Sequence, residues 1–278
     1  MTETIALPGA LAAKLDTVRA RLHSLGGVLV AFSGGADSAL VLALAREVLG
    51  DRAAAAMGVS AAYPEEEVRS ARATAEHLGV TLLEPPTAQL ADAAFLRNDG
   101  QRCFHCRQEL YTVLRPLADE LGLPAICDGT IIDDLGDVRP GLRATAEAEV
   151  ISPLAEAQIG KSEVREASRA LGLPTWDKPQ QACLSSRIPH GTPITVTSLR
   201  RVEEAEGWLR ARGFRQLRVR EHGDVARIEL EELEDIARLA RDPLRGECVA
   251  ALRALGYLFV SLDLERFRSG KLNRIGGD

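Results

Sequence analysis

Hydrophobic and polar positions follow two rhythms through the first two thirds of the chain. Short apolar runs bounded by glycine, proline or charged residues predict buried strands at 27–32, 55–63, 80–85 and 124–129. Apolar residues recurring at helical spacing predict helices at 39–49, 65–78, 106–121 and 161–171. Because strand and helix alternate, we expect an α/β fold with a doubly wound, mainly parallel sheet and right-handed crossovers.

The rhythm changes after residue 195. A helix, a hairpin turning at His222-Gly223-Asp224, a long helix and a final strand are predicted, in that order, at 198–212, 216–230, 232–255 and 256–262. Residues 175–195 are rich in proline, glycine and serine, and residues 131–143 are expected to form a functional loop. We therefore predict a larger domain over 1–190 and a smaller α+β domain over 191–278.

Composition and charge narrow the classes of function. No stretch approaches the roughly 18 consecutive apolar residues of a membrane-spanning helix, and residues 1–15 lack the basic flank and apolar run of a secretory signal. We therefore expect a cytoplasmic protein with no membrane partner. The formal charge of −6 argues against a broad nucleic-acid surface, so no nucleic-acid partner is expected. Five cysteines, an odd number for a reducing compartment, favour metal binding or catalysis over disulfides.

The motif SGGADS, residues 33–38, joins the first predicted strand to the first predicted helix. A helix N-terminus presents free backbone N–H groups and the positive end of the helix dipole, and both suit a phosphate. The glycines allow close approach, the serines add hydroxyl donors, and the aspartate is a candidate Mg²⁺ ligand. The Walker pattern GxxxxGK(S/T) is absent. A glycine-rich turn without a ligand is the alternative. The candidate nucleotide contacts are Ser33, Gly34, Gly35, Asp37 and Ser38.

In this position SGGxDS resembles the PP-loop ATP pyrophosphatases, which include GMP synthetase, NAD synthetase and the tRNA thiolases. The resemblance implies cleavage of ATP between its α- and β-phosphates, with the loop holding pyrophosphate while a substrate oxygen attacks the α-phosphorus. Asp128-Gly129-Thr130, at the end of the fourth predicted strand, resembles a second motif of that superfamily. Gly129 and Thr130 are therefore expected beside ATP, as is Ser60 in the second predicted strand. Ile131 stands where such families often carry asparagine.

Three of the cysteines are candidate metal ligands. Cys103 and Cys106 form a CxxC pair, which by itself is compatible with zinc, an iron–sulfur cluster, a redox pair or no function. The sequence has no second CxxC for a four-cysteine zinc site. Cys183 lies in the proline- and glycine-rich stretch. Three cysteines and a vacant fourth position fit a 4Fe–4S cluster with one open iron.

Longer motifs make the resemblance more specific. RCFHCRQELY, DGTIIDDLGDVRPGLRA, SPLAEAQIGKSEVREASRALGLPTWDKPQQACLSSRIPHG and LRVREHGDVARIE resemble the LarE family of ATP-dependent sulfurtransferases. The likeness runs from about Ser33 to about Glu229. It implies that a carboxylate of pyridinium-3,5-biscarboxylic acid mononucleotide is adenylylated and then receives sulfur. The product is a precursor of the nickel-pincer nucleotide cofactor of lactate racemase.

The family has two sources of sulfur. In one kind of member, the cysteine of the ACLxSR motif, here Cys183, gives up its own sulfur and becomes dehydroalanine. In the other kind, three cysteines hold a 4Fe–4S cluster that carries an exchangeable sulfide. Because Cys103 and Cys106 accompany Cys183, the chain resembles the second kind. The sacrificial mechanism is the alternative.

The implied substrate carries a phosphate and two carboxylates, so cations are expected to bind it. Arg218 and Arg220 alternate with apolar residues in a predicted strand and share one face. A solvated face is the ordinary explanation for such arginines, but we assign both to substrate binding, with Arg187 and Glu206. The candidate catalytic residues are Cys183, Asp37 and Arg187.

Two other functions stay open at the level of sequence. A tRNA thiolase would share the loop and a cluster, although the acidic charge argues against it. A nucleotide-binding sensor would share the loop but leave the three cysteines unexplained. The LarE resemblance also implies a homo-oligomer.

Overall fold

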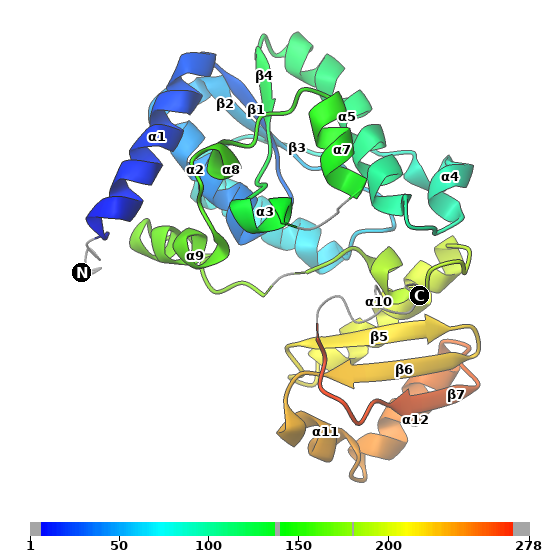
Figure 1. Cartoon of the computed structure of the whole chain (residues 1–278). Coiled ribbons are helices and arrows are strands. Elements are labelled where there is room, and N and C mark those ends of the chain that lie inside the picture. The colour runs from blue at the N-terminus through cyan, green and yellow to red at the C-terminus, as the bar shows by residue number, and fades with distance from the viewer. Residues whose placement is uncertain (1–6, 137–139, 180, 269–278) are drawn as a thin grey trace. The chain divides into compact units, whose positions relative to one another are not determined.

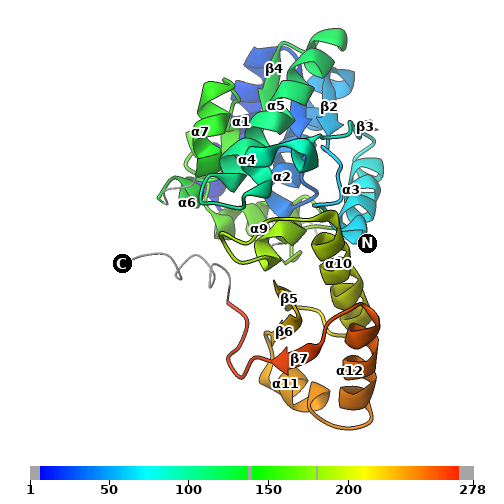
Figure 2. The same cartoon turned by 90° about the vertical axis from the view of Figure 1, so that its right-hand side faces the viewer.

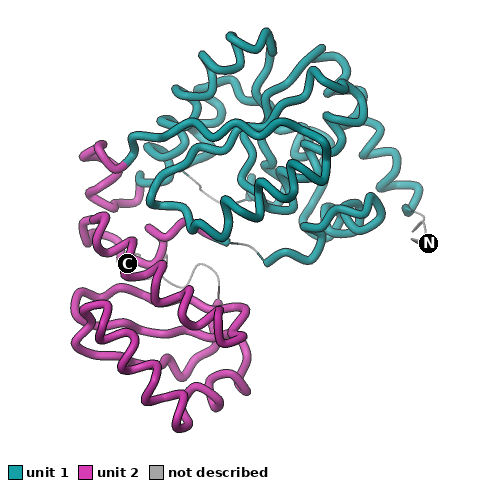
Figure 3. Tube along the Cα trace, turned by 180° about the vertical axis from the view of Figure 1, so that it is seen from behind, with its two compact units in different colours: residues 1–89, 101–181 teal, residues 90–100, 182–278 magenta. Residues whose placement is uncertain are grey.

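The computed structural model describes residues 7–136, 140–179 and 181–268. The chain forms two compact units, coloured differently in Figure 3: unit 1 takes residues 1–89 and 101–181, and unit 2 takes residues 90–100 and 182–278. Unit 2 is therefore built from two separate stretches of chain. The proline- and glycine-rich stretch does contain a change of unit, between Gln181 and Ala182, whereas the predicted domain boundary at residue 190 remains a prediction.

Unit 1 contains a four-stranded parallel sheet in the order β3-β2-β1-β4. Its strands are β1 (Val28–Ala31), β2 (Ala53–Ala56), β3 (Leu82–Leu83) and β4 (Ala125–Cys127). The predicted α/β class with a mainly parallel sheet is confirmed. The strand order reverses between β1 and β4, and open α/β sheets bind ligands beyond the carboxyl ends of the strands at such a switch point.

Helices cover both faces of this sheet (Figure 1). Val28 and Val30 of β1 pack in one apolar cluster with residues of α1, α2 and α9, whereas Leu29 packs in a second cluster with residues of α5. Alternate residues of one buried strand thus serve two cores, which explains why its sequence is apolar throughout. The helices of unit 1 are α1 (Gly9–Leu25), α2 (Ala36–Leu49), α3 (Glu65–His77), α5 (Arg102–Glu120), α6 (Ile132–Leu135), α7 (Pro140–Glu147), α8 (Pro153–Glu156) and α9 (Lys161–Ala170).

Unit 2 is a small α+β unit around a mixed sheet in the order β5-β6-β7. The predicted hairpin is antiparallel, and β7 pairs parallel with β6. Residues of α10, α11 and α12 form one apolar core with the strands, and Figure 2 shows α10 and α12 beside them. The elements are α4 (Ala93–Leu96), η3 (Leu184–Arg187), α10 (Val196–Arg210), β5 (Leu217–His222), β6 (Val225–Leu230), α11 (Leu233–Leu239), α12 (Leu244–Ala254) and β7 (Phe259–Leu262).

Several predicted elements differ in extent from the observed ones. The predicted helix 232–255 is two helices, α11 and α12, because Pro243 lies between them. The predicted loop 131–143 contains α6 and the start of α7. The strand predicted at 55–63 is shorter and begins earlier in the structure, at Ala53–Ala56. Among the described residues, no helix has the length and apolar character needed to cross a membrane.

Candidate active site

The SGGADS motif forms the turn from β1 into α2. Gly34 has a φ of +72°, a conformation that glycine adopts readily, and a Cβ there would lie 2.9 Å from the Ala71 Cβ. The Ser38 hydroxyl holds the turn together, because it accepts from the Ser33 N–H at 3.2 Å and donates to the Gly35 carbonyl at 3.3 Å. A fixed turn of backbone thus precedes the N-terminus of a helix, the arrangement that binds phosphate.

Gly129 brings the second motif directly against this loop. A Cβ at position 129 would lie only 2.5 Å from the backbone nitrogen of Ser38, so the approach requires glycine. Buried Asp128 holds the following turn: its carboxylate accepts from the Thr130 N–H at 3.0 Å, the Thr130 hydroxyl at 2.7 Å and the Ser152 hydroxyl at 2.7 Å. The two predicted nucleotide motifs therefore meet at the switch point between β1 and β4.

Ser60 lies beyond the carboxyl end of β2. Its hydroxyl oxygen accepts from the Gln89 amide at 2.8 Å and from the Ala62 N–H at 3.2 Å. Ile131 is buried in the apolar core of unit 1. The position that carries asparagine in related families therefore serves packing in this chain.

Two lysines that the sequence analysis did not single out contact the loop. Lys161, the first residue of α9, places its Nζ 2.7 Å from each carboxylate oxygen of Asp37. Lys178 donates to the Gly34 carbonyl at 3.0 Å and pairs with Glu67 at 2.9 Å. The sequence contained one signal for Lys161, because a lysine at the start of a predicted helix is unusual: its charge opposes the helix dipole. No local pattern marks Lys178, whose partners are distant in sequence.

Cys103 and Cys106 lie at the N-terminal end of α5, which begins at Arg102, so the helix predicted from residue 106 extends over the CxxC pair. Residues three apart share a helix face. Cys103 is exposed, Cys106 is half-buried with its Sγ 3.6 Å from the Gln89 amide oxygen, and neither forms a disulfide. Burial raises the pKa of the Cys127 thiol to about 12 and that of the Cys248 thiol to about 11. These two cysteines therefore stay protonated and serve as small core residues.

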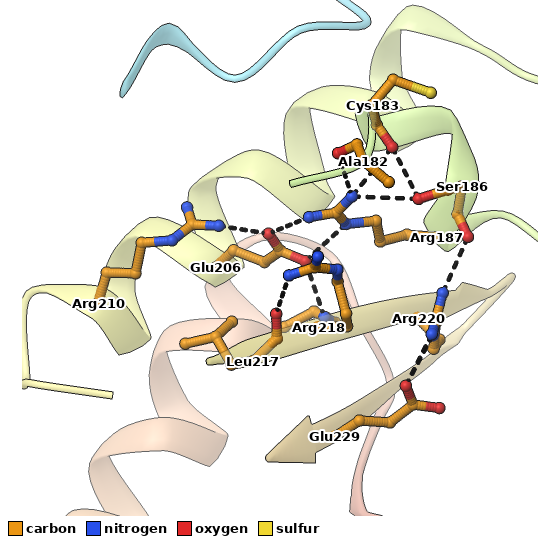
Figure 4. Close-up of polar contacts among 11 residues, drawn as sticks. Ala182, Cys183, Ser186, Arg187, Glu206, Arg210, Leu217, Arg218, Arg220 and Glu229 are labelled. Atoms are coloured by element: carbon orange, nitrogen blue, oxygen red, sulfur yellow. Dashed lines mark hydrogen bonds and ion pairs between the residues drawn. The ribbon is translucent and has the colours of Figure 1, made fainter. Parts of the chain in front are cut away.

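Cys183 lies in unit 2 immediately before η3, and its side chain is half-buried. The Arg187 guanidinium donates to the carbonyls of Ala182 and Cys183, while its other edge pairs with Glu206 at 2.8 and 2.9 Å (Figure 4). Neither side chain of this pair is exposed. The geometry favours a role for Arg187 in positioning the backbone around Cys183.

Arg218 and Arg220 are also buried, with exposed fractions of 3% and 5%, so the solvated-face alternative is wrong. Arg220 pairs with Glu229 at 2.8 Å and donates to the Ser186 carbonyl at 2.9 Å. Burial and the neighbouring Arg187 charge lower the pKa of Arg218 to about 10. The environment of Arg218 therefore disfavours its positive charge.

Among the residues that the structure describes in this part of unit 2, three buried arginines (Arg187, Arg218 and Arg220) lie with two buried glutamates (Glu206 and Glu229). Burial alone would raise the pKa of Glu206, but the Arg187, Arg210 and Arg218 guanidinium groups together outweigh burial and hold that pKa below its usual value. A surplus of buried positive charge is suited to accept an anion. We refer to the following residues as the arginine cluster: Arg187, Glu206, Arg210, Arg218, Arg220, Arg227 and Glu229.

No three histidine, cysteine, aspartate or glutamate side chains are gathered closely enough to hold a metal ion among the residues that the structure describes. Cys103 and Cys106 belong to unit 1, whereas Cys183 belongs to unit 2. The structure thus brings together Asp37, the loop and Gly129 in one unit, and Cys183, Arg187, Glu206, Arg218 and Arg220 in the other.

Comparison with known proteins places the chain among PP-loop enzymes. Residues 12–97 match the family model of asparagine synthase. The chain is 45% identical to an uncharacterised protein of Synechocystis sp., over 95% of this chain and 98% of that protein. It is 28% identical to tRNA(Ile)-lysidine synthase of Salinispora arenicola, over 90% of this chain and 79% of that enzyme.

A further relative identifies the family. The chain is 40% identical to pyridinium-3,5-bisthiocarboxylic acid mononucleotide synthase of Lactiplantibacillus plantarum, over 95% of both proteins. The matched 95% of the chain includes residues of both units. The chain therefore belongs to the LarE family of ATP-using PP-loop enzymes.

Proposed function

We propose that this protein adenylylates a carboxylate of pyridinium-3,5-biscarboxylic acid mononucleotide and replaces one of its oxygens with sulfur. The reaction would belong to the synthesis of the nickel-pincer nucleotide cofactor. One observation carries the proposal: the phosphate loop and Gly129 meet at the switch point of a chain 40% identical to a bisthiocarboxylic acid mononucleotide synthase. We expect the enzyme to work in the cytoplasm as a homo-oligomer.

The first step would use the phosphate loop. A carboxylate oxygen attacks the α-phosphorus of ATP, the bond to the bridging oxygen of pyrophosphate breaks, and an acyl adenylate forms. Backbone N–H groups at the start of α2 and the hydroxyls of Ser33 and Ser38 would stabilise charge on the departing pyrophosphate. Asp37 offers an oxygen ligand to Mg²⁺, which would supply further neutralisation of the phosphates.

The second step would insert sulfur. A sulfur nucleophile attacks the acyl carbon, the carbon–oxygen bond to AMP breaks, and AMP leaves with that electron pair. The products are a thiocarboxylate and AMP. Cys183, fixed through its carbonyl by Arg187, is the candidate to deliver the sulfur or to hold the group that does.

Cys103, Cys106 and Cys183 are the residues proposed to hold a 4Fe–4S cluster. Cys103 and Cys106 share one helix face and are free thiols, as cluster ligands must be. Such a cluster would supply the sulfide, and no cysteine would be consumed. In the alternative, the Cys183 thiolate displaces AMP to form a thioester, and loss of the Cα proton then breaks the Cβ–Sγ bond, which leaves the thiocarboxylate and a dehydroalanine at position 183.

The arginine cluster is proposed to bind the phosphate or a carboxylate of the mononucleotide. Its support is the surplus of buried guanidinium groups and the lowered pKa of Arg218. An anion placed there would offset the repulsion that now disfavours the Arg218 charge. Charge-assisted hydrogen bonds to a phosphate are also among the stronger contacts in proteins.

One anaerobic experiment tests the reaction and the sulfur source. With ATP, Mg²⁺ and the dicarboxylate mononucleotide, we expect AMP and pyrophosphate, and production of ADP and phosphate would contradict the assignment. Protein holding a cluster should be brown, lose iron when Cys103, Cys106 or Cys183 is replaced by serine, and turn over repeatedly with added sulfide. Cys248→Ala serves as the control that keeps the colour. A single turnover with loss of the mass of H₂S at Cys183 would establish the sacrificial mechanism instead.

A further inference from the structure

The ion pair between Lys161 and Asp37 joins the first residue of α9 to the phosphate loop. We propose that Lys161 is the cation that binds the pyrophosphate group of ATP, and that Asp37 holds it in place while the loop is empty. The inference rests on the proposed function, because it assumes that the loop binds the phosphates of ATP.

The Lys161 ammonium group is paired with a carboxylate and is still accessible to solvent. The Lys161 Nζ lies 2.7 Å from both carboxylate oxygens of Asp37, in the first turn of the helix that follows the loop. Both side chains are about one-third exposed, at 32% and 28%. Solvent, and therefore a ligand, can reach both ends of the pair. An ammonium group held this way can exchange a carboxylate partner for a phosphate with little movement.

The Lys161 side chain is not needed to fasten α9. The start of that helix is capped by Asp133, which accepts the Lys161 N–H at 2.9 Å, and by Glu163, which accepts the Gly160 N–H at 2.9 Å. Val164 and Ala167 are buried in the core. Because exposed ion pairs add little to folding stability, the contact with Asp37 calls for another explanation.

Electrostatics provide that explanation. A lysine at the first position of a helix opposes the helix dipole, and a carboxylate in a phosphate loop repels a polyphosphate. The Lys161 charge is unfavourable alone at its own helix, whereas the Asp37 charge, in the first turn of α2, is unfavourable only toward the ligand; in the empty loop the two charges neutralise each other. When the nucleotide and its divalent cation bind, the carboxylate can turn to the cation and the ammonium to the phosphates.

Lys178 serves as a contrast on the same loop. Its Nζ donates to the Gly34 carbonyl and the Ser70 hydroxyl and pairs with Glu67, and its side chain is only 15% exposed. These partners tie Lys178 to the backbone of the loop and to α3. Lys178 therefore supports the loop, whereas Lys161 is placed to meet the ligand.

The test compares two lysines whose ion pairs have the same length and nearly the same exposure. Lys14 pairs with Glu163 of α9 at 2.7 Å, and its pair is 33% and 28% exposed, almost as in the Lys161 pair. Calorimetric titration of pyrophosphate with Mg²⁺ should give a Kd about 10-fold or more higher for Lys161→Met, a near-parental value for Lys14→Met, and a largely restored value for Lys161→Arg. The Kd for AMP, which lacks the pyrophosphate group, should change by less than about 3-fold in all three.

A second comparison isolates the exchange of partners. Without divalent cations, Asp37→Asn should bind pyrophosphate more tightly than the parent, because the repulsive carboxylate is gone and Lys161 is released. Adding Lys161→Met to Asp37→Asn should abolish that gain. A double variant that keeps the gain would assign it to repulsion alone and overturn the inference.

The outcomes also separate this inference from the proposed function. A parent protein that binds neither ATP nor pyrophosphate would sink both. A parent that binds pyrophosphate, with Lys161→Met binding it equally well, would overturn only the role of Lys161. If Lys161→Met has a lower Tm than Lys14→Met, Lys161→Gln replaces it, because the amide keeps a polar contact with Asp37.

Discussion

The two nucleotide motifs touch at Gly129, where there is space for a hydrogen atom but not for a side chain. In Gly129→Ala, the new Cβ would lie 2.5 Å from the Ser38 nitrogen and 2.8 Å from its Cα, and backbone atoms cannot rotate away. We expect the loop to shift, the free energy of unfolding to fall by about 1–3 kcal/mol, and ATP affinity to fall with it. Chemical unfolding and calorimetric titration with ATP measure the two effects.

Gly136→Ala is the matched control for this substitution. Its φ is −74°, and among the described residues the nearest atom to an added Cβ is 3.8 Å away, an ordinary contact. It should behave as the parent. Parental ATP affinity in Gly129→Ala would mean that the two motifs need not touch for binding.

Single residues were predictable where their chemistry is local. The loop residues Ser33 to Ser38 follow from one strand, one helix and a short motif between them. Arg187 and Glu206 were both singled out, but as substrate contacts. Their pairing with each other joins residues 19 positions apart in sequence, and no periodicity shows which side chains meet across elements. Assignments of role at these positions remain predictions.

At the scale of elements, strand β5 carries two arginines in different circumstances. Arg220 is matched by Glu229, whereas the surroundings of Arg218 lower its pKa to about 10. The charged form of Arg218 therefore costs stability at pH values below about 10. Arg218→Met should weaken binding of the mononucleotide about 10-fold or more without lowering the free energy of unfolding. Arg220→Met should lower both, because Glu229 loses a buried partner.

Arg200→Met supplies the control for the pair. Arg200 pairs with Glu204 on α10, but its side chain is 78% exposed, so the loss should be below about 1 kcal/mol. Fluorescence or calorimetric titration with the mononucleotide, alongside urea unfolding, separates affinity from stability. Unchanged affinity in Arg218→Met would remove this residue from the substrate site.

Element boundaries depended on information that the local pattern lacks. Helix α5 begins at Arg102, before the apolar periodicity becomes clear, because Arg102 and Phe104 are buried by the surrounding unit. Tertiary burial thus extends the helix over the CxxC pair. The break between α11 and α12 was marked by Pro243, although the apolar pattern continues across it.

At the scale of the whole molecule, unit 2 borrows residues 90–100 from within the first half of the sequence. Asn98 is fully buried, has a φ of +55°, and donates its amide to the carbonyls of Ile188, Pro189 and Thr192 at 2.8 to 3.2 Å. Asn98→Ala removes these bonds and places alanine at a positive φ. We expect unit 2 to lose about 2–4 kcal/mol of unfolding free energy.

Two features of the chain sharpen this measurement. Asn98→Gly tolerates the positive φ but also lacks the amide, so its difference from Asn98→Ala isolates backbone strain. Trp208 lies in unit 2 and Trp176 in unit 1, and Trp176→Phe leaves fluorescence that reports on unit 2. Parental stability in both Asn98 variants would show that the amide does not hold the two stretches together.

The sequence offered no route to this discontinuity. The expected division at residue 190 was drawn from proline, glycine and serine content, which marks flexible chain but not long-range partners. Residues 90–100 carry no repeat or motif that points to residues 182–194. Only the folded arrangement reveals that the amide of one asparagine joins them.

Because a protein is synthesised from its N-terminus, residues 90–100 are made before the rest of unit 2, with which they pack. Residues 90–100 leave the ribosome well before Gly191, whose N–H bonds to the Asn98 carbonyl, and Ile194, whose N–H bonds to the Leu96 carbonyl. During this interval the nascent chain displays Phe95, a side chain that is 1% exposed in the finished protein. Unit 1 can assemble its sheet once residue 127 is available, but unit 2 must complete its fold after translation has passed residue 194. Translation pausing between these points would therefore prolong the exposure of this apolar side chain to water.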